Sequence, residues 1–179
     1  RKEAEDHLAK LDRTSIKDLD KEVFYKSVIL TCDGIIRFAE KYGIEAEKSA
    51  KVEANEQRKY ELEKIAKICT RVPANPPESF HEAIQFVWFT QLGGIISENP
   101  LALNPGRFDQ FMYPYYKKDT EKGIITKEEA QELIEALWLK FSEWVWTISS
   151  NTAGFFAGYN QFQNLTVGGR TREGLDATN

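Results

Sequence analysis

The sequence predicts a mostly α-helical fold, and three observations support this. Apolar residues recur at helical spacing over long stretches, and Pro, Asn, Thr and Gly stand where helices start or stop. Strand-like alternation is almost absent, and only residues 165–167 suggest a short strand. The 179 residues, 41% hydrophobic and 29% charged, suit one globular domain with a respectable core.

Two helices are predicted in the first part of the chain. The first covers residues 20–42, and Gly43 after it is a typical C-terminal stop. The second runs from Glu45 to about Cys69, with an apolar stripe in its second half. A proline-rich turn, residues 72–77, ends it. The stripe residues are Val23, Phe24, Val28, Cys32, Ile35, Ile36 and Ala39 in the first helix and Leu62, Ile65, Ala66 and Cys69 in the second.

A third helix is predicted after the prolines. Asn75 is placed to cap it, with Pro76 at its first position and Glu78 at the spacing of a capping box. We expect this helix to run to about Leu92. It is apolar on nearly every face, and a helix of this kind must be buried on all sides.

The last predicted helix starts at a second capping box, formed by Thr126 and Glu129, and extends to about Ile148. It is also too apolar to have a free face. Residues 93–106 and 149–164 are expected to be irregular. Because two such helices are hard to bury in a chain of this size, we expect the chain to lie inside a larger protein or assembly.

Composition excludes several classes of protein. The net charge is −4, the pI is about 5.4, and the basic residues are scattered, so nucleic acid is not an expected partner. No uncharged apolar stretch reaches the roughly 20 residues that cross a bilayer, so a membrane partner is not expected either. Two cysteines and two histidines are too few for a zinc site, and no metal is predicted. This cysteine usage fits a reducing cytoplasm.

Four segments together resemble one enzyme family, the glycyl radical enzymes related to pyruvate formate-lyase. They are Val72–Gln85 (VPANPPESFHEAIQ), Gly106–Tyr116 (GRFDQFMYPYY), Ile125–Ala130 with Leu137–Lys140, and Asn164–Gly169 with Asp176–Asn179. Any one of them is weak, but four in register are a strong signal. The resemblance covers residues 20–179, and the pattern is most similar to the glycerol dehydratase and decarboxylase branches.

The resemblance implies a fold and a chemistry for the whole enzyme. Residues 1–179 would be a fragment of the family's ten-stranded α/β barrel. In the family, an iron–sulfur S-adenosylmethionine activating enzyme installs a glycyl radical. The glycyl radical converts a cysteine to a thiyl, and the thiyl takes hydrogen from a small-molecule substrate. The full-length protein would therefore be an anaerobic, cytoplasmic homodimer with the activating enzyme as partner.

In the family, two loops carry this chemistry, and neither has a counterpart in this sequence. The Gly-Cys-Val-Glu context of the catalytic cysteine and the Arg-Val-x-Gly-Tyr context of the radical glycine are both missing. Cys32 and Cys69 fall on helical stripes and are predicted to be buried structural thiols. We therefore assign no catalytic residue and no cofactor to this chain, and we expect it to be inactive alone.

The resemblance places part of the substrate pocket within the chain. In the family, the residues four and five positions before the Gly-Arg of GRxDQ face the substrate, and these are Leu101 and Ala102 here. The diol dehydratase branch has a His-Ser pair at this point. The Phe and Trp that close the pocket of pyruvate formate-lyase correspond to Phe156 and Phe162. These four residues suggest an apolar wall, although simple packing is the alternative for each.

Other polar residues have ordinary explanations. We expect His81 to be a structural hydrogen-bonding residue rather than a base. Arg107 and Asp109 could pair with an anionic substrate, but we expect them to tie their loop to neighbouring backbone. Glu128, Glu129 and Glu132 are typical of the first turn of a helix.

Three hypotheses for function follow. The first is the central fragment of a glycyl radical lyase that cleaves a C–C bond, most simply by decarboxylating an aromatic, arylacetate-type acid. The second keeps the family and changes the reaction, to a diol dehydratase, a formate acetyltransferase or an arylalkylsuccinate synthase. Leu101 and Ala102 argue against the dehydratase, because they cannot bond a hydroxyl. The third is a non-catalytic helical fragment that binds a partner through aromatic faces.

Overall fold

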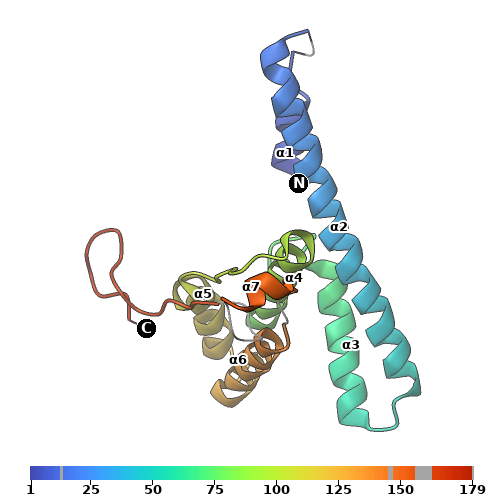
Figure 1. Cartoon of the computed structure of the whole chain (residues 1–179). Coiled ribbons are helices and arrows are strands. Elements are labelled where there is room, and N and C mark those ends of the chain that lie inside the picture. Colours follow the sequence, from blue (N-terminus) through green and yellow to red (C-terminus); the bar gives the residue numbers. More distant parts are fainter. Residues whose placement is uncertain (13, 145–146, 156–162, 179) are drawn as a thin grey trace. The chain divides into compact units, whose positions relative to one another are not determined.

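The structure is a computed structural model, and it describes residues 1–12, 14–144, 147–155 and 163–178 (Figure 1). The described residues form seven helices, and the mostly helical prediction is confirmed. The chain divides into two compact units, Arg1–Pro76 and Pro77–Asn179.

The first unit consists of one long helix and two shorter ones that pack on it. Helix α2 spans Ile16–Val52, α1 spans Lys2–Leu8 and α3 spans Glu56–Arg71. Figure 1 shows α1 beside the N-terminal part of α2 and α3 beside its C-terminal part. Small residues dominate the core of the unit, which allows the helix axes to approach closely. The buried residues are Ala4, Ala39, Gly43, Ala46, Ala50, Ala66, Ile68, Cys69 and Val72.

The predicted stop at Gly43 is wrong, because α2 continues through it to Val52. A Cβ on Gly43 would lie 3.2 Å from the carbonyl oxygen of Ala66 and 3.3 Å from the Cβ of Cys69. Glycine therefore serves the packing of α3 on α2 at this point, and not the end of a helix. The turn to α3 comes later, where Asn55 caps α3 by accepting a hydrogen bond from the N–H of Arg58 at 2.9 Å.

The second unit packs α4 (Phe80–Glu98) against α5 (Phe108–Glu121) and α6 (Lys127–Ser142), with the short α7 (Ser150–Ala153) after them. Its core is rich in aromatic residues. Trp88 stacks on Trp144 with ring centroids 5.1 Å apart, and both rings contact Phe141. The buried core residues are Phe80, Ala83, Ile84, Val87, Phe108, Met112, Ile125, Ala130 and Leu137.

Helix α4 begins later and ends later than predicted. Its N-cap is Ser79, whose side chain accepts a hydrogen bond from the N–H of Glu82, and not Asn75. Asn75 instead donates to the carbonyl oxygen of Arg71. The helix continues through residues 93–98, which were expected to be irregular, and its C-cap is Asn99, which has the left-handed φ of 42°. Gly94 in this stretch is closely packed, because an added Cβ would lie 2.7 Å from a methyl carbon of Leu103.

The capping box at the start of α6 is confirmed. The N–H of Glu129 donates to the Thr126 hydroxyl at 3.1 Å, and the Glu129 carboxylate accepts from the N–H of Thr126 at 2.8 Å. The helix ends at Ser142, short of the predicted Ile148. The expectation of no free face is also wrong, because the polar side of α6 is exposed while Ala130 and Leu137 are buried.

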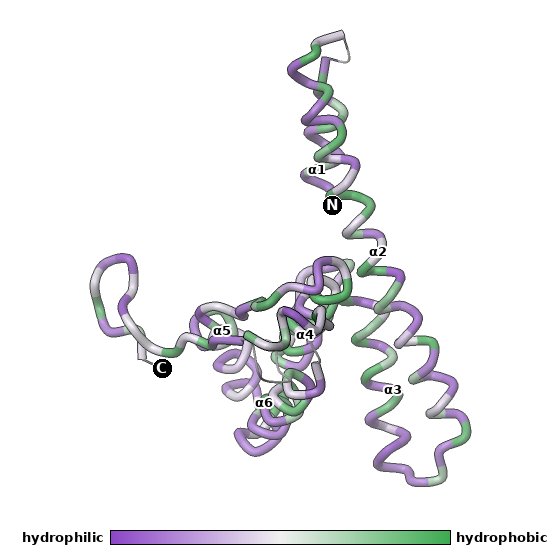
Figure 2. Tube along the Cα trace, viewed as in Figure 1, coloured by the Kyte–Doolittle hydropathy of each residue, from purple (hydrophilic) through white to green (hydrophobic). Residues whose placement is uncertain are grey.

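The predicted strand at residues 165–167 forms only an isolated parallel bridge, between Leu165 and Gly106. Further along, Arg170 and Asp176 form an antiparallel bridge around a turn. Figure 2 shows hydrophilic residues interrupting the hydrophobic ones along the described helices. None of these helices has a stretch both long and apolar enough to cross a membrane.

Candidate functional site

The candidate site is the segment between α4 and α5, residues 99–106, which is anchored at both ends. The side chain of Asn99 donates to the carbonyl oxygen of Thr147 at 2.7 Å. At the other end, the side-chain oxygen of Asn104 accepts from the N–H of Asn164 at 2.7 Å. These anchors come from two different loops, and within the segment Ala102 and Gly106 are isolated β-bridge residues.

Leu101 and Ala102 lie between the two anchors. Leu101 is half-buried and Ala102 is exposed. Leu103 packs against α4 so closely that a Cβ on Gly94 would lie 2.7 Å from its methyl group. Leu101 and Leu103 are half-buried and Ala102 is exposed, and alternate side chains of an extended stretch point to opposite sides, so Ala102 points away from α4 while Leu101 lies on the same side as Leu103. The segment therefore offers methyl groups and no side-chain hydrogen-bonding group at positions 101 and 102.

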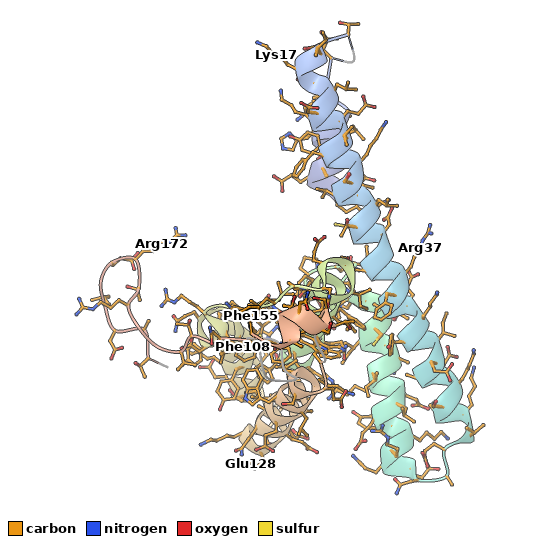
Figure 3. The ribbon with its side chains drawn as sticks, viewed as in Figure 1. Lys17, Arg37, Phe108, Glu128, Phe155 and Arg172 are labelled. Atoms are coloured by element: carbon orange, nitrogen blue, oxygen red, sulfur yellow. The ribbon has the colours of Figure 1, made fainter. Side chains whose placement is uncertain are left out.

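The other two predicted pocket residues, Phe156 and Phe162, lie outside the described residues. Leu101 and Ala102 are thus the predicted site residues that the structure places. The described neighbour Phe155 is 87% exposed. Figure 3 shows its ring at the end of α7.

Arg107, Asp109 and Gln110 join the start of α5 to the loop at residues 168–177. Arg107 donates to the carbonyl oxygens of Gly168 and Arg170, and Asp109 accepts from the N–H of Gly168. This confirms that Arg107 and Asp109 tie their loop to neighbouring backbone. Burial raises the pKa of Asp109, but the hydrogen bonds from Gly168 and Gln110 and the nearby Arg107 charge outweigh it, and the net pKa is lowered.

The two cysteines do not have the character of catalytic thiols. Cys69 is buried on α3, as predicted, and burial raises the pKa of its thiol to about 11. A reactive cysteine needs a lowered pKa and partial exposure. Cys32 lies on α2 and is half-buried, so its predicted full burial is wrong.

The remaining polar candidates have structural positions. His81 is half-buried in the first turn of α4. Glu129 belongs to the capping box, and Glu128 and Glu132 are exposed beside it. Among the described residues, no group of three or more His, Cys, Asp or Glu side chains is placed to hold a metal ion.

A groove between α4 and α5 escaped the sequence analysis. It encloses about 320 Å³ and is mostly apolar, with Thr90, Gln91 and Tyr115 as its polar members. Phe86 and Phe111 contribute aromatic walls. The sequence did hold an indication of this groove, because α4 is apolar on every face. Helices α5 and α6 cover only part of that apolar surface.

Comparison with known proteins agrees with this picture. A family model described as pyruvate formate lyase-like matches residues 1–179. The isethionate sulfite-lyase of Oleidesulfovibrio alaskensis is 40% identical over 182 residues, which cover 100% of this chain and 22% of that protein. The indoleacetate decarboxylase of Tractidigestivibacter scatoligenes is 40% identical over 167 residues, 93% of this chain and 19% of that protein.

A solved structure gives the same result for the fold. It concerns 1,2-propanediol dehydration in Roseburia inulinivorans, and it matches with a TM-score of 0.96 and 40% sequence identity. The match covers 99% of this chain and 22% of the other. The chain thus spans about a fifth of the length of the proteins it matches. It belongs to the pyruvate formate-lyase-like family of glycyl radical enzymes.

Proposed function

We propose that this chain is the central part of a glycyl radical lyase that, at full length, decarboxylates an aromatic acid of the arylacetate type. The observation that carries the proposal is the apolar pair Leu101–Ala102. Ala102 is exposed on an anchored segment and has no group to bond a substrate hydroxyl. A pocket wall of this kind suits a hydrocarbon or aromatic surface. An indoleacetate decarboxylase is among the relatives at 40% identity, but an isethionate sulfite-lyase is equally similar, so the choice of reaction rests on the pocket wall.

The role of this chain in that reaction is to bind and orient. The family's glycyl radical and thiyl supply the hydrogen-atom chemistry when they are formed. Neither described cysteine fits the thiyl role, because Cys69 is buried with a raised pKa and Cys32 lies within a long helix. We assign no bond-making step to the chain, and Leu101 and Ala102 act by shaping the wall and excluding water. Phe156 and Phe162 are proposed as further members of the same wall.

A diol dehydratase is the second candidate, because the structure concerned with 1,2-propanediol dehydration matches with a TM-score of 0.96. A diol brings two hydroxyl groups, and each loses a hydrogen bond with water when it is buried. A site that offers these hydroxyl groups no hydrogen-bonding partner would bind the diol poorly, since an unpaired buried polar group costs about 1–3 kcal/mol. Leu101 and Ala102 offer none, so the remainder of the pocket would have to bond both hydroxyls.

The remaining proposals concern the whole protein. We infer a homodimeric cytoplasmic enzyme that is activated by a separate iron–sulfur protein under anaerobic conditions. These features follow from membership of the family and not from any contact within this chain.

A substrate panel tests the proposal. The full-length enzyme is produced without oxygen, activated, and checked for its organic radical by electron paramagnetic resonance. It is then assayed with phenylacetate, indoleacetate, 1,2-propanediol and isethionate. We expect CO₂ and the methylarene from an arylacetate, with one proton taken up for each CO₂ released. Turnover of 1,2-propanediol or isethionate without any decarboxylation would overturn the proposal.

A further inference from the structure

Two charged side chains of one motif hold the backbone of a single glycine. Arg107 Nη2 donates to the carbonyl oxygen of Gly168 at 3.2 Å and to that of Arg170 at 3.0 Å. Asp109 Oδ2 accepts from the N–H of Gly168 at 2.6 Å. The guanidinium and the carboxylate therefore bind the C=O and the N–H of the same residue. Hydrogen bonds that involve a charged group are the stronger kind.

The turn that they hold requires glycine. Gly168 and Gly169 have φ values of +64° and +90°, a region that L side chains rarely adopt. The next contact fixes the far side of the turn, because Ala177 donates from its N–H to the carbonyl oxygen of Gly169 at 3.0 Å. Gln110 completes the arrangement by donating to the carbonyl oxygen of Ala177 at 2.6 Å.

The same two stretches of chain are joined again beside the candidate pocket wall. The carbonyl oxygen of Gly106 accepts from the N–H of Thr166 at 2.9 Å, and Asn104 accepts from the N–H of Asn164 at 2.7 Å. Leu101 and Ala102 are the residues just before this junction. A shift of residues 164–170 would therefore be passed to the wall through these two hydrogen bonds.

We propose that Arg107 and Asp109 act together as positioning residues for the substrate pocket. By holding Gly168, they fix the register between residues 104–110 and 164–170, and so the place of Leu101 and Ala102. They touch no reacting atom and are not catalytic residues. The proposal rests on the proposed function only in so far as Leu101 and Ala102 face the substrate.

The test uses Arg107→Lys and Asp109→Asn in the full-length enzyme. Lysine keeps the charge but loses the planar group that reaches two carbonyl oxygens, and asparagine keeps an acceptor but loses the charge. Matched controls are Arg172→Lys and Glu173→Gln, which make the same chemical changes in the same loop. Figure 3 shows the Arg172 side chain directed away from the chain.

Two measurements are made on each variant. For the substrate that the wild-type enzyme turns over, we expect both test variants to raise KM roughly tenfold and to change kcat less than about twofold. The KM of the double variant should be no higher than that of the more strongly affected single variant, because both side chains hold the same glycine. Hydrogen exchange, followed by mass spectrometry, should become faster at residues 99–106 as well as at residues 163–170. Both controls should behave as wild type.

The outcomes separate this proposal from the proposed function. If the wild-type enzyme acts on a diol and not on an arylacetate, the proposed function fails, and the KM comparison is made with the diol. If the enzyme turns over no substrate of the panel, the hydrogen-exchange rate at residues 99–106 is the measurement that tests the proposal. Unchanged KM, or faster exchange confined to residues 163–170, would show that the contact stabilises its own loop only and would overturn the proposal.

Discussion

The carboxylate of Asp119, on α5, accepts a hydrogen bond from the backbone N–H of Phe80 at 2.7 Å, although 39 residues separate them. Both residues are 1% exposed. The first N–H groups of a helix have no partner within the helix. Asp119 therefore supplies to α4 a cap from another helix, and it adds to the local cap made by Ser79.

Replacing Asp119 with alanine should destabilise the protein markedly. The change leaves the buried N–H of Phe80 without its acceptor, and we expect a loss of about 1–3 kcal/mol in the free energy of unfolding. Asp119→Asn keeps an acceptor oxygen and should lose less. Urea denaturation of the full-length protein, followed by circular dichroism, compares both variants with wild type. Equal stability of wild type and Asp119→Ala would show that the bond does not support α4.

Two glycines of α2 should respond to alanine with opposite signs. Gly34 has nothing within 4 Å of an added Cβ, so Gly34→Ala should stabilise the helix by about 0.5–1 kcal/mol. The Cβ of Gly43→Ala would lie 3.2 Å from the backbone of Ala66. This crowding should cost about 1–3 kcal/mol and outweigh the gain in helix propensity.

The same denaturation assay measures both variants, and each serves as the control for the other. Stabilisation by both substitutions would contradict the tight packing of α3 on α2 at Gly43.

Cys69 should be much less reactive than Cys32 toward iodoacetamide at pH 8. Burial raises the pKa of Cys69 from 9.0 to about 11, so its thiolate is scarce in the folded protein. The stability that this raised pKa reflects is fully present below pH 9 and is lost as pH rises toward about 11. Peptide mapping gives the rates of modification.

A Cys69→Ala variant is the control for the pH effect, and it should lose less stability than the wild type between pH 9 and pH 10.5. Equal labelling rates at the two thiols, or the same pH dependence in both proteins, would contradict the burial of Cys69.

The sequence predicted the helical class, the α6 capping box and the tying role of Arg107 and Asp109. The predicted helix stop at Gly43 and the predicted helix cap at Asn75 were wrong, for reasons that lie in the tertiary structure. Gly43 looked like a stop because its packing partners in α3, Ala66 and Cys69, lie more than 20 residues further on, and local sequence does not show such contacts. Asn75 looked like a cap because the spacing fitted, whereas Ser79 and the distant Asp119 make the actual cap of α4.

The candidate site was predicted only in part. The resemblance named Leu101 and Ala102, and the structure places them on a segment held at Asn99 and Asn104. Neither anchor follows from periodicity, because each joins side chain to backbone across many residues. The groove between α4 and α5 was missed because the apolar surface of α4 was expected to be fully covered, whereas part of it lines the groove.

The most direct test of the account is an exchange of the apolar pair in the activated full-length enzyme. The double variant Leu101→His, Ala102→Ser introduces hydrogen-bonding groups into the proposed wall. We measure kcat/KM for phenylacetate, indoleacetate and 1,2-propanediol in wild type and variant, and spin-count the radical in both. The account predicts that wild type decarboxylates an arylacetate and that the variant loses at least about tenfold in kcat/KM at equal radical content. An unchanged kcat/KM, or a wild-type enzyme that dehydrates the diol instead, would contradict it.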